Sequence, residues 1–151
     1  MAGGVLVAGW APGRKLSGLA LRVEVAGELA TVWLGSGRVV RWHDLAPFDL
    51  SGVRFGVDEQ GRLLVVEAPP ARLHPDVLDG GEPGRFTLSE DNMGYLYLAK
   101  RARSERSAEV DVEDVGDFIV DVDRRGRVIG IEFYEADGAP PELHERALAP
   151  E

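Results

Sequence analysis

The residues best suited to chemistry are acidic side chains gathered in the last third of the chain: Asp114, Asp121, Asp123 and Glu132. Asp121 and Asp123 share one face of a predicted strand, roughly 7 Å apart, and Glu132 falls on the strand that follows. Converging carboxylates suit calcium, but the chain has no Asp-x-Asp-x-Asp-Gly loop with a distal glutamate. We therefore expect a solvated acidic face crossed by weak ion pairs, and no metal or other cofactor.

Catalytic nucleophiles and metal ligands of other kinds have little support. The chain has no cysteine, and none of its serines stands in a Gly-x-Ser-x-Gly motif. His43, His74 and His144 lack ligand spacing, although both His74 and His144 follow a leucine, so a site shared between two halves of the chain is one alternative. We predict no catalytic residue.

One basic cluster interrupts an acidic chain. Arginines follow an aromatic strand here, and together they form a candidate partner-contact edge: Tyr95, Tyr97, Arg101, Arg103 and Arg106. Tyrosines beside arginines can stack on single-stranded nucleic acid. A net charge of −9 argues against that partner, because lysine and arginine supply affinity for phosphates. The composition favours another protein, or a second copy of the chain, at this edge.

The overall composition is typical of one compact β-rich unit. The 151 residues are 44% hydrophobic and include 19 glycines and 9 prolines, which favours short strands over long helices. No apolar run approaches the roughly 20 residues of a membrane span, and the start of the chain lacks the features of a secretion signal. We therefore expect a cytoplasmic protein without a membrane partner.

The strands that must position these residues are predicted by a period-two pattern. Its clearest example is 118–133, where an Asp-Arg-Arg-Gly turn joins two alternating strands. The same pattern appears earlier, with Val53, Asp58 and Gly61 standing 65 residues before Phe118, Asp123 and Gly126. The predicted strands of the first half cover residues 5–8, 19–25, 29–34, 38–42, 53–57 and 62–68.

These matches predict an internal duplication. A first repeat at 19–71 and a second at 84–136 follow an N-terminal strand and turn at 1–18, are joined by a Pro/Gly linker at 72–83, and precede a tail at 137–151. The shift of 65 is expected to hold over all five strands of each repeat; the alternative is that two β-hairpins match by chance. Packed together, two small repeats would bury enough surface to fold as an all-β sandwich or barrel, with a short helix at 141–148. The tryptophans Trp10, Trp33 and Trp42 are expected to pack in the core or at the end of a barrel rather than to form a ligand cage, with Trp42 as the exception to check for exposure.

The second repeat also resembles a known family. Leu96-Tyr97-Leu98, Val120-Asp121-Val122-Asp123 and the run from Gly126 to Glu132 are similar to the bacterial family catalogued as domain of unknown function 2283. The resemblance covers residues of about 92–136, and a more divergent copy lies at about 28–71. It departs at Gly94, where the family usually has an aspartate, and at Val65, which stands in place of Gly130.

The resemblance implies a small β-rich fold and no established catalytic residues, and some relatives suggest a role in neutralising a small partner protein. We therefore expect a non-enzymatic protein-binding module. Two alternatives stay open: a ligand, metal or enzymatic site at the junction of the repeats, and a structural homodimer.

Overall fold

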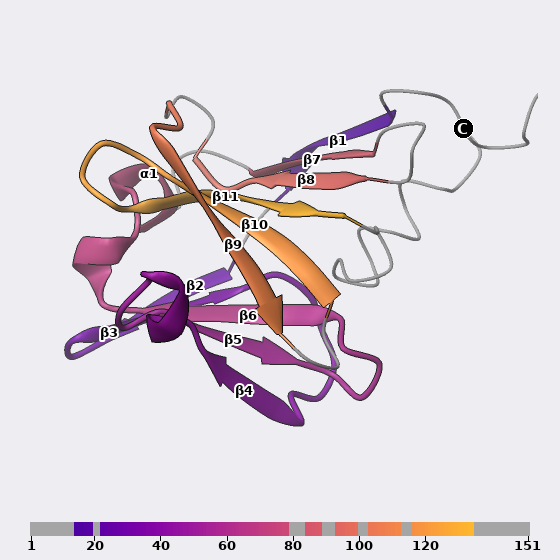
Figure 1. Cartoon of the computed structure of the whole chain (residues 1–151), viewed down its shortest axis with the longest axis horizontal. Helices are drawn as coiled ribbons and strands as arrows, with labels where there is room; N and C mark the ends of the chain where they lie inside the picture. Colours follow the sequence, from indigo (N-terminus) through magenta and orange to yellow (C-terminus); the bar gives the residue numbers. More distant parts are fainter. Residues whose placement is uncertain are drawn as a thin grey trace, which may run out of the picture.

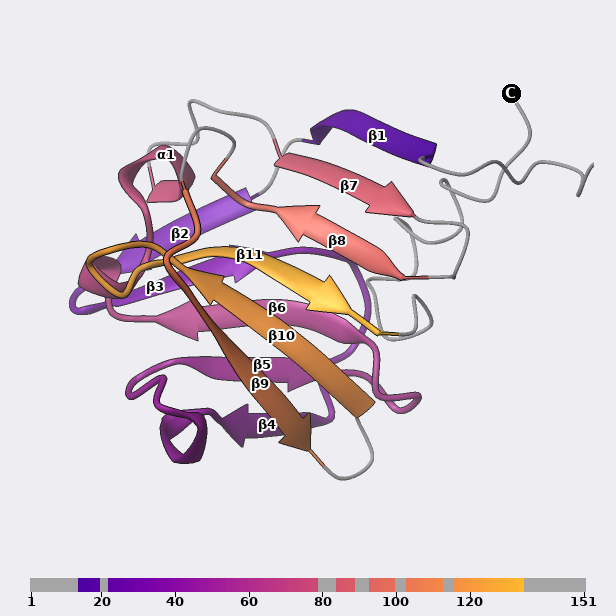
Figure 2. The same cartoon turned by 45° about the horizontal axis from the view of Figure 1, so that its top comes forward.

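The chain folds as two antiparallel β-sheets packed face to face, in a computed structural model (Figure 1). The structure describes residues 14–19, 22–78, 84–88, 93–99, 103–112 and 116–134. The expected strand at 5–8, the end of the linker and the expected helix at 141–148 lie outside these residues. Figure 2 shows the second sheet lying across the first, with β9 and β10 passing over β4 and β5.

The first sheet contains five strands of the first repeat. Their order across the sheet is β2 (Arg22–Ala26), β3 (Leu29–Trp33), β6 (Leu63–Ala68), β5 (Arg54–Val57) and β4 (Arg41–Asp44). A short 3₁₀ turn, η1 (Ala46–Phe48), lies between β4 and β5. The strand expected at 29–34 and the hairpin expected at 53–68 are confirmed, whereas the strand expected at 38–42 is β4, which begins three residues further on.

The second sheet repeats this order and adds one strand. It runs β1 (Arg14–Leu19), β7 (Gly84–Leu88), β8 (Gly94–Tyr97), β11 (Val128–Phe133), β10 (Gly116–Val122) and β9 (Arg106–Val112). η2 (Pro70–Arg72) lies where the first repeat meets the linker, and the linker itself forms the helical turn α1 (Pro75–Leu78). Because β2-β3-β6-β5-β4 and β7-β8-β11-β10-β9 have the same connectivity, the duplication is a property of the fold, and its form is a two-sheet sandwich.

The turns that join the last two strands of each repeat are alike in detail. Asp58 Oδ1 accepts the backbone N–H of Gln60 and of Arg62, and Asp58 Oδ2 accepts the Arg62 Nε–H. Asp123 bonds Arg125 and Arg127 in the same way. A glycine with φ of 78° or 76° closes each turn, at Gly61 and Gly126, a conformation that glycine adopts without strain.

The expected shift of 65 residues holds for only three of the five strand pairs. It relates β4, β5 and β6 to β9, β10 and β11, including the register irregularity at Gly56/Val57 and at Asp121/Val122. In contrast, Val32 pairs with Val66 as Leu96 pairs with Ile131, so β3 and β8 are related by 64 residues. By the same comparison, β2 and β7 are related by 63. One additional residue in each of two loops of the second repeat accounts for the slips.

The strand expected at 19–25 is divided between the two sheets. β1 ends at Leu19 and pairs with β7 of the second sheet, whereas β2 begins at Arg22 and pairs with β3 of the first. The alternation of apolar residues predicted the two segments as one strand because it carries no information about pairing partners. The segment 14–26 therefore contributes one strand, β1, to the second sheet and one strand, β2, to the first.

The core lies between the inner faces and is built around phenylalanines. Phe118 contacts Phe133 and the facing Phe55 edge-on, with ring centroids 5.4 and 5.7 Å apart. Phe86 packs on Phe133 at 6.5 Å. All four are at most 1% exposed. In the described part of the chain, no helix has the length and hydropathy needed to cross a membrane.

Candidate functional site

The outer face of the second sheet carries an organised group of polar and aromatic side chains. Residues that alternate with the buried Leu96, Val120 and Ile131 point to this face. We call four of them the acid–tyrosine cluster: Tyr95 on β8, Ser107 on β9, Asp121 on β10 and Glu132 on β11. The candidate site is this cluster together with Arg85 on β7 and Tyr97 on β8.

Gly130 makes the centre of the cluster possible. It pairs with Asp121 on one side and with Tyr97 on the other. A Cβ atom at Gly130 would lie 2.7 Å from the Tyr95 hydroxyl oxygen, closer than real Cβ contacts allow. The absence of a side chain lets the Tyr95 ring lie across β11, so that its hydroxyl donates a short hydrogen bond to Asp121 Oδ2.

Asp121 is the buried centre of the cluster. It is 3% exposed, although it points to the outer face, and its Oδ1 accepts a second short hydrogen bond from the Ser107 hydroxyl. Burial, followed by the hydrogen bond to Asp121, raises the pKa of Tyr95, which keeps the phenol protonated as a donor. Asp121 is therefore held as an acceptor by two hydroxyl groups.

Glu132 completes the cluster as a second carboxyl group. Burial, the negative charge of Asp121 and a hydrogen bond with it raise the pKa of Glu132 to about 7. No cation among the described residues forms an ion pair with either carboxyl group. Because its pKa is about 7, Glu132 carries a proton in roughly half of the molecules at neutral pH.

Tyr97 and Arg85 extend the site toward β7. The Tyr95 and Tyr97 rings lie 4.1 Å apart between centroids, and the Arg85 guanidinium carbon lies 4.0 Å from the centre of the Tyr97 ring. Arg85 Nε is buried and has no hydrogen-bond acceptor among the described residues. The result is a stack of an arginine and two tyrosines on an outer sheet face.

The first sheet shows a related but different outer face. Arg22 lies over Trp33 at 4.8 Å, in the positions of Arg85 and Tyr97, and Arg54 lies over Trp42 at 4.5 Å. Neither tryptophan packs between the sheets, because both alternate with inward residues, and Trp42, the exception named from the sequence, is 40% exposed. Trp10 lies outside the described residues.

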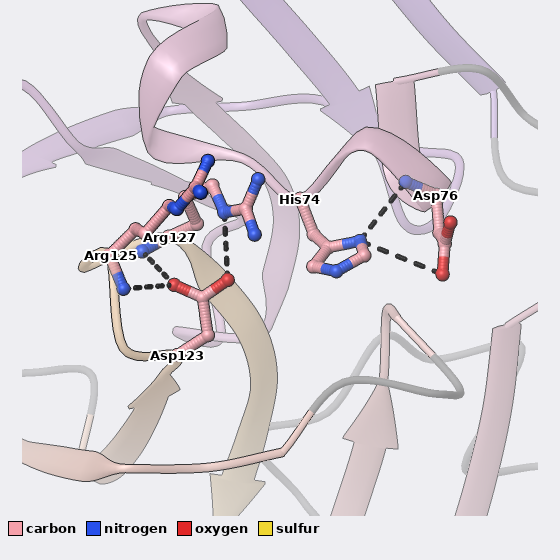
Figure 3. A network of polar contacts seen from close by, with 5 residues as sticks. All are labelled: His74, Asp76, Asp123, Arg125 and Arg127. Carbon is pink, nitrogen blue, oxygen red and sulfur yellow. Dashed lines mark hydrogen bonds and ion pairs between the residues drawn. The ribbon is translucent and has the colours of Figure 1, made fainter.

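The predicted acidic site does not form a single centre. Asp123 lies in the turn after β10, where it anchors Arg125 and Arg127 (Figure 3). Burial would raise the pKa of Asp123, but hydrogen bonds from the backbone and side chain of Arg127 outweigh it and lower the pKa. Asp121 and Glu132 do meet, on the outer face rather than at the junction of the repeats, and Asp114 lies outside the described residues.

His74 has a structural contact of its own. Its Nδ1 accepts the backbone N–H of Asp76 at 3.1 Å, which caps the start of α1 (Figure 3). His144, its proposed counterpart, lies outside the described residues. Within the part of the chain that the structure describes, no group of three or more histidine and acidic residues is placed to hold a metal ion.

The residues of the predicted contact edge are separated. Tyr95 and Tyr97 lie on β8, which is paired on both sides, so they belong to the middle of a face. Arg106 lies on the edge strand β9 and forms an ion pair with Asp49, which ties the two sheets together. Arg103 lies in the exposed segment before β9, and Arg101 lies outside the described residues.

Comparisons with models of protein families, with curated proteins and with solved structures found no match. The site therefore has to be interpreted from its own geometry. Sequence reasoning missed the contribution of Arg85, Ser107 and Gly130. The one available signal was the glycine inside a strand, which often marks a close approach of another group.

Proposed function

We propose that the protein is a non-enzymatic binding module that holds another protein on the outer face of its second sheet. The observation that carries this proposal is the stack of Arg85, Tyr97 and Tyr95. Arginine and tyrosine are enriched among the residues that dominate binding energy at protein interfaces. Here they stand together on the outer face of the second sheet.

The stack is also preorganised. Tyr95 is fixed at its hydroxyl by Asp121 and along its ring by Tyr97, and the Arg85 guanidinium lies over the Tyr97 ring. Side chains that are already ordered lose little conformational entropy on binding, a loss that otherwise costs about 0.5–1.5 kcal/mol for each flexible side chain. This favours recognition of a partner surface over a purely structural role.

The test is capture of a partner by the tagged full chain from a lysate of its own cells at low and moderate salt, followed by mass spectrometry. We compare the unmodified chain with Tyr97→Ala and, as a matched control on the other outer face, Trp42→Ala. We expect one stoichiometric protein with the unmodified chain and with Trp42→Ala, and at least tenfold less with Tyr97→Ala. Equal capture by all three chains, or only self-association by analytical ultracentrifugation, contradicts the proposal.

A further inference from the structure

The two outer faces differ in charge at the position that Arg54 occupies on the first sheet. On the first sheet, Arg54 of β5 pairs with Glu67 of β6 on one side and with Asp44 of β4 on the other. Its guanidinium donates to Glu67 Oε1 from Nε at 3.1 Å and from Nη2 at 2.6 Å. An arginine therefore stands between two acidic residues on neighbouring strands and forms an ion pair with one of them, Glu67.

The second sheet keeps the acidic residues and lacks the arginine. Ile119 of β10, the counterpart of Arg54, pairs with Glu132 of β11 and with Glu109 of β9. Strands lie about 4.8 Å apart, so the two glutamates are roughly 10 Å apart across an isoleucine. Asp121 adds a third carboxyl group from the same strand as Ile119. The unbalanced charge agrees with the raised pKa of Glu132, whose causes are burial and Asp121.

We infer that this part of the face binds an arginine side chain of the partner, laid over Ile119 between Glu132 and Glu109. The inference rests on the proposed function and names the chemistry of the partner at that site. The guanidinium would take the place that the Arg54 guanidinium takes over the first sheet. It would donate to Glu132 and lie close to Asp121, on an isoleucine that offers an apolar surface to its planar face.

Arginine fits this position better than lysine. The equivalent Glu67 is bound by two guanidinium nitrogens of one planar group, a geometry that an ammonium group cannot reproduce. The Tyr95 ring on the other side of Glu132 offers a further surface for stacking. The net charge of −9 would also speed the approach of a basic partner.

The direct test is an NMR titration of the ¹⁵N-labelled full chain with the blocked tripeptide Gly-Arg-Gly. Its lysine and citrulline analogues are controls, because citrulline keeps the shape and loses the charge. We expect saturable shifts at the amides of Ile119, Gly130 and Glu132 with the arginine peptide, at least fivefold weaker binding of the lysine peptide and no saturation with citrulline. Equal binding of citrulline, or shifts confined to other faces, overturns the inference.

A substitution that supplies the arginine from within the chain gives a second test. Ile119→Arg is expected to weaken binding of the arginine peptide at least tenfold and to lower the pKa of Glu132, followed by carboxyl ¹³C NMR, by more than one pH unit. Ile119→Met, which adds length without charge, is expected to change neither. An unchanged Glu132 pKa with unchanged peptide binding overturns the inference. Glu132→Gln provides a check that does not depend on folding of the arginine variant, because it should also abolish peptide binding.

The two proposals fail in different ways. If Tyr97→Ala loses a captured protein and Ile119→Arg retains it fully, the binding module stands and the arginine site is wrong. If the arginine peptide binds this face but no cellular protein is captured, the chemistry of the site stands and the proposed function is wrong.

Discussion

The outer faces of the two sheets can be compared along one row of residues that crosses four strands in each. On the first sheet this row contains Trp33, Val65, Gly56 and Trp42, and on the second sheet it contains Tyr97, Gly130, Asp121 and Ser107. Each row has one glycine in its central cross-strand pair, but on opposite strands. A Cβ atom at Gly56 would meet the Val65 side chain at 2.4 Å, and one at Gly130 would meet Tyr95. The first row is apolar around Gly56, whereas in the second row the glycine lies on the neighbouring strand and leaves space for the buried carboxylate of Asp121.

The inner faces differ in a complementary way. Phe86, Phe118 and Phe133 of the second repeat occupy the positions of Val23, Val53 and Ala68 in the first. The second repeat supplies the larger side chain at these three positions, whereas Phe55 of the first repeat is larger than its counterpart Val120. The side chains that differ in size between the two repeats therefore fit together in the core, which agrees with the close packing of protein interiors.

Truncation of single core side chains should show the difference between the two repeats most strongly. Phe118→Ala removes a ring that contacts both Phe55 and Phe133, and it should lower the free energy of unfolding by about 3–5 kcal/mol. Val53→Ala, at the equivalent position of the first repeat, removes fewer atoms and should cost about half as much. Urea denaturation measures both. Equal losses would contradict the unequal roles of the two repeats.

Giving the second repeat the valine of the first should break the acid–tyrosine cluster. Gly130→Val places a side chain against Tyr95 and disrupts its hydrogen bond to Asp121, at an expected cost of about 2–3 kcal/mol. Tyr95→Thr introduces the residue of the equivalent position, Thr31, and should recover part of this loss in the double variant. A double-mutant cycle by thermal unfolding tests the coupling. Additive effects would mean that Gly130 and Tyr95 are independent.

The two aspartate turns should respond alike to substitution, whereas the two outer sheet faces should respond differently. Asp58→Ala and Asp123→Ala each remove acceptors of two backbone N–H groups and one arginine, and each should cost about 1–2 kcal/mol at neutral pH. Because the pKa of Asp123 is lowered in the folded state, its contribution is present above the ordinary aspartate pKa and disappears as pH falls through the lowered value. The Asp123→Ala penalty should therefore shrink in acid. A penalty independent of pH would rule out this account.

The smallest expected effect concerns the unbalanced carboxyl group. The pKa of Glu132 is raised from 4.5 to about 7, so its folded-state proton stabilises the protein fully below 4.5, and this stabilisation is lost as pH rises through 7. Glu132→Gln should remove this dependence and raise stability at pH 8 by about 1 kcal/mol, allowing for screening of a half-buried group. At pH 5 the change should be near zero. Glu67→Gln, which keeps an acceptor oxygen for Arg54 but removes its negative charge, should instead be slightly destabilising at both values, as measured by thermal unfolding.

Local chemistry explains how much could be predicted from the sequence. The strands around both aspartate turns followed from alternation and from a glycine at positive φ, since each signal lies within a few residues. The sequence did not reveal that the shift between the repeats is 64 residues for β3 and 63 for β2 instead of 65. An added loop residue changes the alignment of the strands without changing their composition. The acid–tyrosine cluster was also inaccessible. It joins β8, β9, β10 and β11 through cross-strand register, which the sequence does not contain.

The placement of β1 has a consequence for synthesis of the chain. It pairs with β7, and that pairing extends to Leu88, so the second sheet cannot gain its first strand until residue 88 has left the ribosome. The last strand of the first repeat ends at Ala68, so the strands of the first sheet can pair earlier, at a stage when β1 does not yet have its partner β7. Relocation of residues 14–19 to a position directly before β7 would make that contact local, and should speed folding by lowering contact order.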